Sequence, residues 1–461
     1  MSAALAARDM EDARERNGGR GRDGGKRRGG GRGAWRSRGS AKKGRSARDT
    51  PETNDRRNRE RGRYQPYRNG GNRGGGRKKA AFEQPLLMVE VEGQEEAAWE
   101  GVRVRMASYN LLADSVLFKH RSLYRSAPLG DLKWATRKPK IVDQMTELSA
   151  DIYALQEYEC QRSGLSEMLY RRGYRVLGQE RSNNGANLDG CGFAFKVETI
   201  DLVRWQVIHL NVQEGAHHRY EDVSARIGPS FTSVLNRNNI GIVALFNLKG
   251  DSGGTLFCAV NTHMLFNPRR GEVKLAQVLL LLDDVKTFLT LSLGEELAKT
   301  TPLVFLGDCN LLPHSKLYQF LATGSLSLSG DEWAATLSGQ EEDKGTTAVV
   351  HPGGMDVEPM EYHGRAVAVK TQGTDIHVRH NMNWVSVYDH VVGRGSRSCA
   401  ATTIVSNKLG TVDHMFYTPN NVRLTAVLEI PSLDGVRLLP TRSHPSDHLM
   451  IAADFYLRGN E

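Results

Sequence analysis

Short apolar runs that end abruptly in polar residues recur along the chain from about residue 100 onward. Residues 102–111 alternate apolar and polar side chains, and residues 302–310 (PLVFLGDCN) pass from an apolar run into Gly, Asp, Cys and Asn. Runs of this length that are bounded by turn residues are typical of buried strands. The same criteria predict further strands at 151–157, 191–196, 202–210, 240–248, 255–263, 412–417 and 449–456.

Helical periodicity separates several of these strands. Apolar residues recur at helical spacing over 272–291, and similar patterns predict helices at 133–149, 165–173 and 315–323. Strands that alternate with helices predict an α/β protein built of sheet and helix layers. Residues 329–397 lack this regularity. We expect an irregular insertion there, with one strand near 384–388 and with surface histidines at His351, His363, His377 and His380.

Charge divides the chain into two parts. Residues 1–80 hold 25 Lys and Arg against 9 Asp and Glu, whereas the remainder holds 37 against 44. The first part is rich in Gly and poor in aliphatic residues, so it cannot bury enough surface to offset its chain entropy. We therefore predict a disordered, basic Arg/Gly-rich arm over 1–85 and a folded domain over 100–459 that carries the 329–397 insertion.

The basic arm is expected to bind nucleic acid. Arginine binds phosphate and stacks on bases, and glycine keeps such a segment mobile. RNA is the partner that we favour, although a solvated linker or a nuclear import signal would have a similar composition.

The cysteines and the apolar runs indicate the compartment. The five cysteines are far apart and form no CxxC pair, which argues against a disulfide framework and a zinc site. No apolar run approaches the roughly 20 residues that cross a bilayer. We expect no membrane association, and a cytoplasmic or nuclear location or both.

Polar residues at successive strand ends carry the chemistry. Each has an ordinary explanation by itself, as a turn residue, a solvated strand end or a core histidine, but their recurrence predicts a shared site. Carboxylate oxygens suit a hard divalent cation such as Mg²⁺, with Mn²⁺ as an alternative. Amide and imidazole donors can hold a phosphate and stabilise charge on its oxygens. Phosphodiester hydrolysis is therefore predicted at Asn110, Glu157, His263, Asp308, Asn310, Asp413, Asp447 and His448.

Several short motifs resemble, in order, those of the endonuclease/exonuclease/phosphatase superfamily. They are SYN (108–110), LQE (155–157), DGC…FK (189–196), NTH (261–263), GDxN (307–310), VD (412–413) and SDH (446–448). The run HMLFNPRRGEVKLAQ (263–277) is similar to the carbon-catabolite-repressor-type deadenylases, especially their Angel-like and plant members. The resemblance covers about residues 102–457 and implies a four-layered α/β sandwich, in which two packed mixed sheets are flanked by helices.

The resemblance also implies roles for individual residues. Glu157 would be the principal Mg²⁺ ligand, with Asn110 nearby, and Asp308 would bind metal or orient the attacking water. His448, oriented by Asp447 or Asp413, would stabilise the transition state. Contacts with the scissile phosphate are implied for His263 and Asn310, contacts with the terminal nucleotide for Glu198 and Pro268, and a weaker role behind the site for Asn239.

Two departures from the family pattern affect the expected substrate and the expected partner. Poly(A)-specific members carry an Asn and a Phe shortly before the VD motif, but residues 401–411 (ATTIVSNKLGT) contain no aromatic side chain. The leucine-rich repeats that dock the type members onto a scaffold are absent, so the scaffold partner is unknown. We expect a Mg²⁺-dependent 3′ exoribonuclease of the mRNA deadenylase type, acting on mRNA 3′ ends. The alternatives are a phosphatase acting on RNA termini (2′,3′-cyclic phosphate), an inactive RNA-binding adaptor, or a DNA-repair or lipid-phosphate enzyme.

Overall fold

The computed structural model describes residues 82–91, 101–181, 189–212, 217–250, 254–330, 337–340, 360–388, 401–405, 408–433 and 435–459. All of these lie in one compact unit, Arg77–Glu461. The basic arm predicted over 1–85 falls almost entirely outside the described residues. None of the helices in the described part of the chain is long and apolar enough to cross a membrane.

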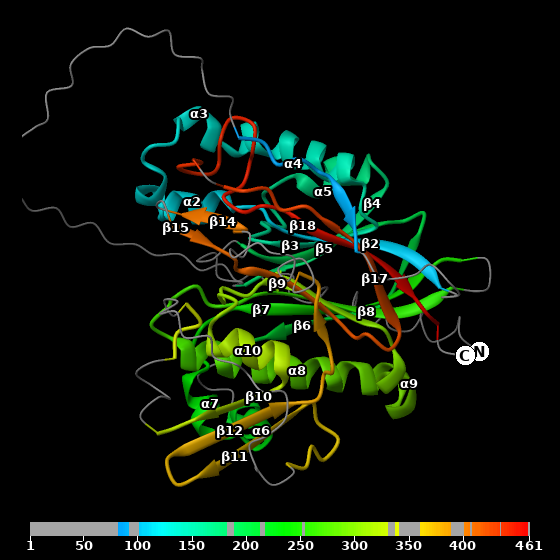
Figure 1. Cartoon of the computed structure of the whole chain (residues 1–461), viewed down its shortest axis with the longest axis vertical. Coiled ribbons are helices and arrows are strands. Elements are labelled where there is room, and N and C mark those ends of the chain that lie inside the picture. The colour runs from blue at the N-terminus through cyan, green and yellow to red at the C-terminus, as the bar shows by residue number, and fades with distance from the viewer. Residues whose placement is uncertain are drawn as a thin grey trace, which may run out of the picture. The chain divides into compact units, whose positions relative to one another are not determined.

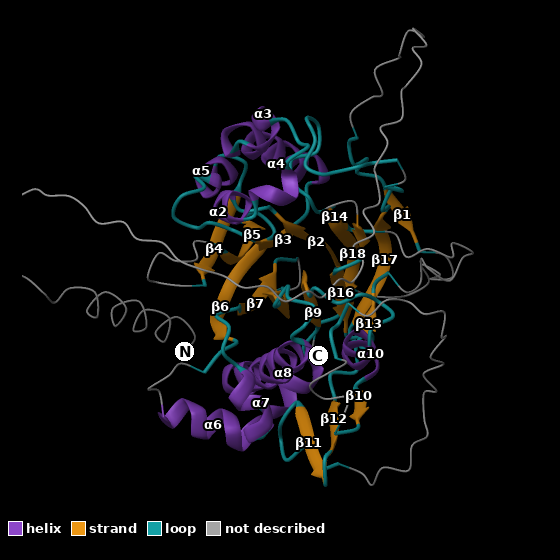
Figure 2. Ribbon diagram, turned by 90° about the vertical axis from the view of Figure 1, so that its left-hand side faces the viewer, coloured by secondary structure: helices purple, strands orange, loops and turns teal. Residues whose placement is uncertain are grey.

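Two mixed sheets pack face to face, and helices cover the outer side of each (Figures 1 and 2). The first sheet has the order β1 (Met88–Glu90), β17 (Val422–Leu428), β18 (Ile451–Leu457), β2 (Val102–Asn110), β3 (Ile152–Gln156), β5 (Gly190–Lys196) and β4 (Tyr174–Glu180). The second has the order β13 (Val385–Ser386), β16 (Asp413–Tyr417), β9 (Leu303–Asp308), β8 (Thr255–His263), β7 (Ile240–Leu248) and β6 (Ile200–His209). Near its centre each sheet has a parallel pair, β2 with β3 and β8 with β9.

The helices form the two outer layers. On the first sheet lie α4 (Trp134–Leu148) and α5 (Leu165–Tyr170), preceded by α2 (Asp114–Lys119), η1 (Arg121–Tyr124) and α3 (Leu129–Leu132). On the second lie α6 (His217–Ile227), α7 (Pro229–Val234), α8 (Gly271–Leu293), α9 (Glu295–Thr300) and α10 (Lys316–Thr323). The predicted four-layered sandwich is confirmed, and the predicted strands and helices lie within a few residues of those observed.

The alternation of side chains along the strands builds the core between the sheets. In β2, Val104 and Met106 point into this core, and Asn110 occupies the same face because side-chain direction repeats every two residues. In β9, Val304 and Leu306 are followed on that face by Asp308. His263 at the end of β8 and Asp413 at the start of β16 obey the same parity. The inner surface of the sandwich therefore becomes polar at one end.

The insertion predicted over 329–397 is less irregular than expected. β11 (Val367–Gln372) and β12 (Asp375–His380) form a hairpin, and β12 also pairs with β10 (Ser325–Leu328). This small sheet lies beside α6 and α8, in the outer layer of the second sheet (Figure 1). The prediction that His380 is a surface residue is wrong, because its ring is buried and faces the carbonyl oxygens of Phe320 and Leu321. His351 lies outside the described residues.

The folded part also begins earlier than residue 100. Strand β1 adds to the edge of the first sheet by pairing with β17. The buried Gln84 side chain exchanges two hydrogen bonds with the backbone of Met450. These contacts fasten the segment before residue 92 to strands at the other end of the chain.

Candidate active site

Three predicted residues meet where the parallel strands of the two sheets end. The Asn110 side-chain amide lies 3.0 Å from Asp308 Oδ2 and 3.4 Å from Glu157 Oε1, so it bridges an acid from each sheet. Glu157 Oε2 accepts a hydrogen bond from Ala113 N at 2.9 Å. Glu157 has a positive φ of 52°, a conformation that costs a non-glycine residue about 1–3 kcal/mol and often marks a functional site.

His263 and Asn310 flank Asp308 on the second sheet. His263 Nε2 lies 3.5 Å from Asp308 Oδ2, and Asp308 Oδ1 accepts from Asn310 N at 3.1 Å. Burial lowers the pKa of His263, with Asp308 acting against that effect, so its ring is held neutral. The close approach of β8 and β9 here requires Gly307, because a Cβ at this position would lie 2.3 Å from Thr262 O.

A buried ion pair stands beside these residues. His448 Nδ1 lies 2.9 Å from Asp413 Oδ2, and His448 Nε2 lies 3.8 Å from Asp308 Oδ2. Burial works against a charged imidazole, but the carboxylates of Asp413 and Asp308 prevail and raise the pKa of His448 well above its usual value. The imidazolium is therefore held with Nδ1 on Asp413 and with Nε2 directed toward the shared cluster.

Asp447 has a different partner from the one predicted. Its Oδ2 accepts a 2.6 Å hydrogen bond from the buried hydroxyl of Tyr124, whereas Asp413 is the acid that contacts His448. The Oδ1 atom of Asp447 is buried without a hydrogen-bond partner among the described residues. Of the two acids predicted to orient His448, the geometry favours Asp413.

The donor set fits a hard divalent cation. Burial raises the pKa of Glu157 to about 8, and the negative charges of Asp447 and Asp189 add to this shift. The described cationic side chains therefore do not balance the negative charge around Glu157, and a bound cation would balance it. Oxygen atoms of Asp447 and Asp189 are buried and without a hydrogen-bond partner in the described part of the chain. Glu157 and Asp308 are the residues that would hold Mg²⁺. Asn110 presents its NH₂ group to both acids while its oxygen accepts from Leu112 N, so its amide would turn before its oxygen could join them.

A second combination of potential metal ligands has a better explanation. One ligand atom from each of Asp308, Asp413 and His448 lies within 4.8 Å of the others. However, His448 Nδ1 is already bonded to Asp413, and a protonated imidazole has no lone pair for a metal. We interpret this group as an ion pair that supports the site.

Three predicted substrate residues lie at different distances from this cluster. Pro268 is exposed in the loop that follows His263. Asn239 is buried next to the backbone of His263 and donates from Nδ2 to His263 O at 2.9 Å. The structure places Glu198 away from this cluster. Strand β5 runs antiparallel to β3, with Gln156 opposite Cys191 and Ile152 opposite Phe195, so Glu198 emerges at the end of the sheet remote from Glu157.

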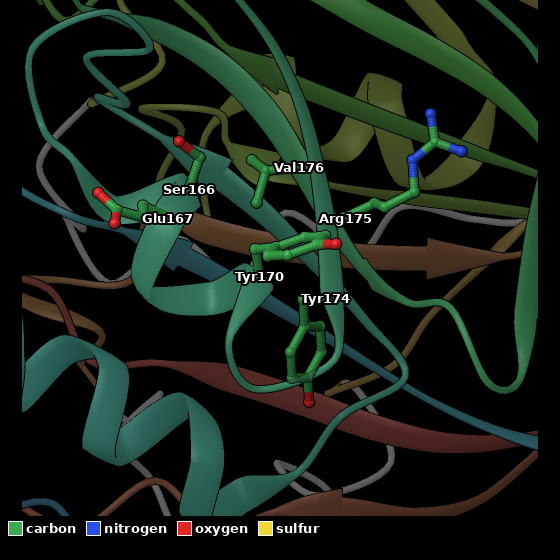
Figure 3. Close-up of a pocket in the computed structure, with 6 residues that line it drawn as sticks. All are labelled: Ser166, Glu167, Tyr170, Tyr174, Arg175 and Val176. Atoms are coloured by element: carbon green, nitrogen blue, oxygen red, sulfur yellow. The ribbon is translucent and has the colours of Figure 1, made fainter.

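A separate hollow of about 450 Å³ lies between α5 and β4, lined by Ser166, Glu167, Tyr170, Tyr174, Arg175 and Val176 (Figure 3). None of the predicted site residues lines it. Tyr174 is paired with Lys196, at the same remote end of the sheet as Glu198. The hollow is therefore not part of the candidate active site.

Several buried residues that support the site were missed by sequence reasoning. Tyr124 comes from an irregular segment that offers no strong pattern. Arg137 is buried in α4 and donates to the carbonyls of Leu111 and Pro445, joining two loops at the site. An Arg on the apolar face of a predicted helix was the signal that could have identified it.

The class of protein that this arrangement defines is a phosphate-ester hydrolase built on a two-sheet α/β sandwich. Residues 107–448 match the model of the Endonuclease/Exonuclease/phosphatase family, and the chain belongs to that family.

Similar proteins include an Angel homologue, a plant carbon catabolite repressor protein 4 homologue and a protein of known structure. Protein angel homolog 2 of Mus musculus is 27% identical over 397 residues, covering 76% of this chain and 68% of the relative. Carbon catabolite repressor protein 4 homolog 5 of Arabidopsis thaliana is 29% identical over 368 residues, covering 76% of each. The solved structure of ANGEL2, a 2′,3′-cyclic phosphatase, in complex with adenosine-2′,3′-vanadate covers 78% of this chain and 98% of its own, with a TM-score of 0.61 and 27% identity. The predicted resemblance is confirmed.

Proposed function

We propose that this protein hydrolyses phosphodiester bonds at the 3′ end of RNA with the help of a divalent cation. The observation that carries the proposal is the meeting of Glu157, Asp308 and the His448–Asp413 pair at one end of the sandwich. Glu157 and Asp308 would hold the cation, which would supply Lewis-acid stabilisation of the phosphate. His448 donates from Nε2 to a phosphate oxygen, His263 and Asn310 contact the phosphate, and Asp308 orients the attacking water.

Removal of a terminal 2′,3′-cyclic phosphate is the reaction that we place first. It is supported by similarity to ANGEL2, which is described as a 2′,3′-cyclic phosphatase. The absence of an aromatic residue in 401–411, where poly(A)-specific members hold adenine, also favours it. Water first opens the ring by breaking one P–O bond, and a second water releases inorganic phosphate and leaves the 2′,3′-diol.

Stepwise 3′ exoribonuclease activity of the deadenylase type is the second candidate. It is supported by similarity to the carbon catabolite repressor protein 4 homologues over three quarters of the chain. The same residues would serve both reactions, because in each of them water attacks phosphorus and a ribose oxygen leaves.

A single assay separates the two candidates. Full-length protein is incubated with 5′-labelled RNA that ends in a 2′,3′-cyclic phosphate, or in oligo(A) with a free 3′-hydroxyl, with Mg²⁺ or with EDTA. Loss of the terminal phosphate at constant chain length supports the first reaction, and a ladder of shorter products supports the second. When a site variant such as Asp413→Asn is assayed, Asp454→Asn is its matched control, because the buried Asp454 pairs with Arg103 and Arg105 away from the site. No Mg²⁺-dependent product from either RNA would reject the proposal.

A further inference from the structure

Helix α8 carries two buried polar side chains, Lys274 and Gln277, in the half nearest the candidate site. Both are 0% exposed. Their neighbours Leu275, Ala276 and Val278 belong to the largest apolar cluster among the described residues. Burying an ammonium or an amide is costly unless its polar atoms find partners. The partners of these two side chains therefore indicate what the helix does.

Gln277 completes a relay that ends on His263. Its Oε1 accepts from Leu265 N at 3.1 Å, and its Nε2 donates to Asn239 Oδ1 at 3.1 Å. Asn239 Nδ2 in turn donates to His263 O at 2.9 Å. A backbone N–H can only donate and a carbonyl can only accept, so both side-chain amides have one permitted orientation. The relay therefore holds the backbone on both sides of Met264.

Lys274 holds the other residue predicted to contact phosphate. Its Nζ donates to Asn310 O at 3.0 Å. Asn310 has a left-handed backbone with a φ of 52°, and its Nδ2 donates to Met264 O at 3.1 Å. The turn after β9 is thus tied both to α8 and to the segment that Gln277 holds.

We propose that Lys274 and Gln277 are positioning residues, which set His263 and Asn310 relative to the phosphate. The inference deepens the proposed function and rests on it. Residues at i and i+3 share one face of a helix, so a single rigid element supports both strand ends. A reacting group displaced by about 1 Å can lose about 100-fold in rate, so support of this kind affects turnover more than affinity.

The sharpest test changes one atom of the relay. In Gln277→Glu the carboxylate still accepts from Leu265 N, but it cannot donate to Asn239 Oδ1, so the bond to His263 O is lost or weakened. We expect kcat on the active RNA substrate to fall about 10- to 100-fold, with KM within about threefold of wild type. Lys274→Met, which removes the ammonium but keeps the length, is expected to have the same kinetic signature.

Asp283→Asn is the matched control. Asp283 lies on the same helix, is equally buried, and pairs with Arg226 at 3.0 Å rather than with the site. It should lower the melting temperature and leave kcat within about twofold of wild type. If Gln277→Glu leaves kcat within threefold, or if Asp283→Asn lowers kcat as much, the positioning role is wrong.

A second readout does not depend on activity. Hydrogen exchange of the Leu265 amide should be slow in wild type and in Gln277→Glu, where its acceptor remains, and at least tenfold faster in Gln277→Leu. Equal exchange in all three would overturn the relay. An inactive wild type with the expected exchange pattern would instead reject the proposed function and leave the structural support in place.

Discussion

Asp413→Asn removes one charge beside His448 and leaves the shape of the site almost unchanged. In the native pair, Nδ1 and Oδ2 are 2.9 Å apart and both side chains are buried. An asparagine at this position can accept from Nδ1 only through its neutral oxygen, and its NH₂ group would oppose the imidazole if the amide turned. We therefore expect the variant to lose the fixed orientation of the His448 ring and part of the preference for its charged form, while retaining the cation site.

The size of the effect follows from the geometry of the pair. Two unit charges 2.9 Å apart attract each other by about 6 kcal/mol at an effective dielectric constant of about 20. Burial opposes this attraction, and removal of one partner from a buried pair typically costs about 3–5 kcal/mol. Asp308, 3.8 Å from Nε2, still favours the charged ring in the variant. A loss of about 3–4 kcal/mol in the transition state corresponds to a fall of about 100- to 1,000-fold in kcat.

Steady-state kinetics on the preferred RNA end at neutral pH measure this loss. Asp454→Asn should keep wild-type kcat, although it also removes a buried carboxylate. Thermal melting of both variants is measured to check that they are folded at the assay temperature. A kcat for Asp413→Asn within threefold of wild type would mean that the pair does not stabilise the transition state.

Three further predictions concern the metal, the arm and the pH dependence of stability. Glu157→Gln should weaken Mg²⁺ binding measured by calorimetry and lower kcat at least 100-fold; unchanged binding would remove Glu157 from the ligand set. Deleting residues 1–76 should weaken RNA binding and flatten its dependence on salt while leaving turnover of a dinucleotide unchanged; an equally steep salt dependence would show that the arm does not bind RNA. Burial lowers the pKa of His380 to about 4, against about 6.5 in an unfolded chain. The stability that neutral His380 contributes is therefore complete above pH 6.5 and decreases toward pH 4, with about 2 kcal/mol lost at pH 5. Urea unfolding of His380→Gln should lack this share of the pH dependence, and identical curves would contradict it.

The central part of the site could be predicted because strand parity is visible in the sequence. An apolar face that repeats every two residues and then becomes polar, as from Leu306 to Asp308 or from Met106 to Asn110, places the polar group at an inner edge of the sheet. Strand direction is not visible in the same way. The role of Glu198 was implied by the family resemblance alone, and nothing in its local sequence reveals that β5 runs antiparallel to β3.

Supporting residues were harder to find because their partners are distant in the chain. Lys274 and Gln277 lie within an apolar helix pattern, and their roles depend on backbone groups of other strands. The hairpin of β11 and β12 did offer a local signal. Alternating residues flank Gly373, whose positive φ of 62° suits a tight turn, but the surrounding Gly-rich segments obscured it.

The hydrogen bond from Ser446 Oγ to Asn110 O, at 2.6 Å, joins residues 336 positions apart. The candidate site is therefore incomplete when only the ends of β2, β3, β8 and β9 are in place. It also needs the segment just before β18, which carries His448. Contacts of such long sequence separation are slow to form, because the entropy of closing a long loop opposes them. A nascent chain on the ribosome therefore lacks a complete candidate site until the segment that carries His448 has emerged.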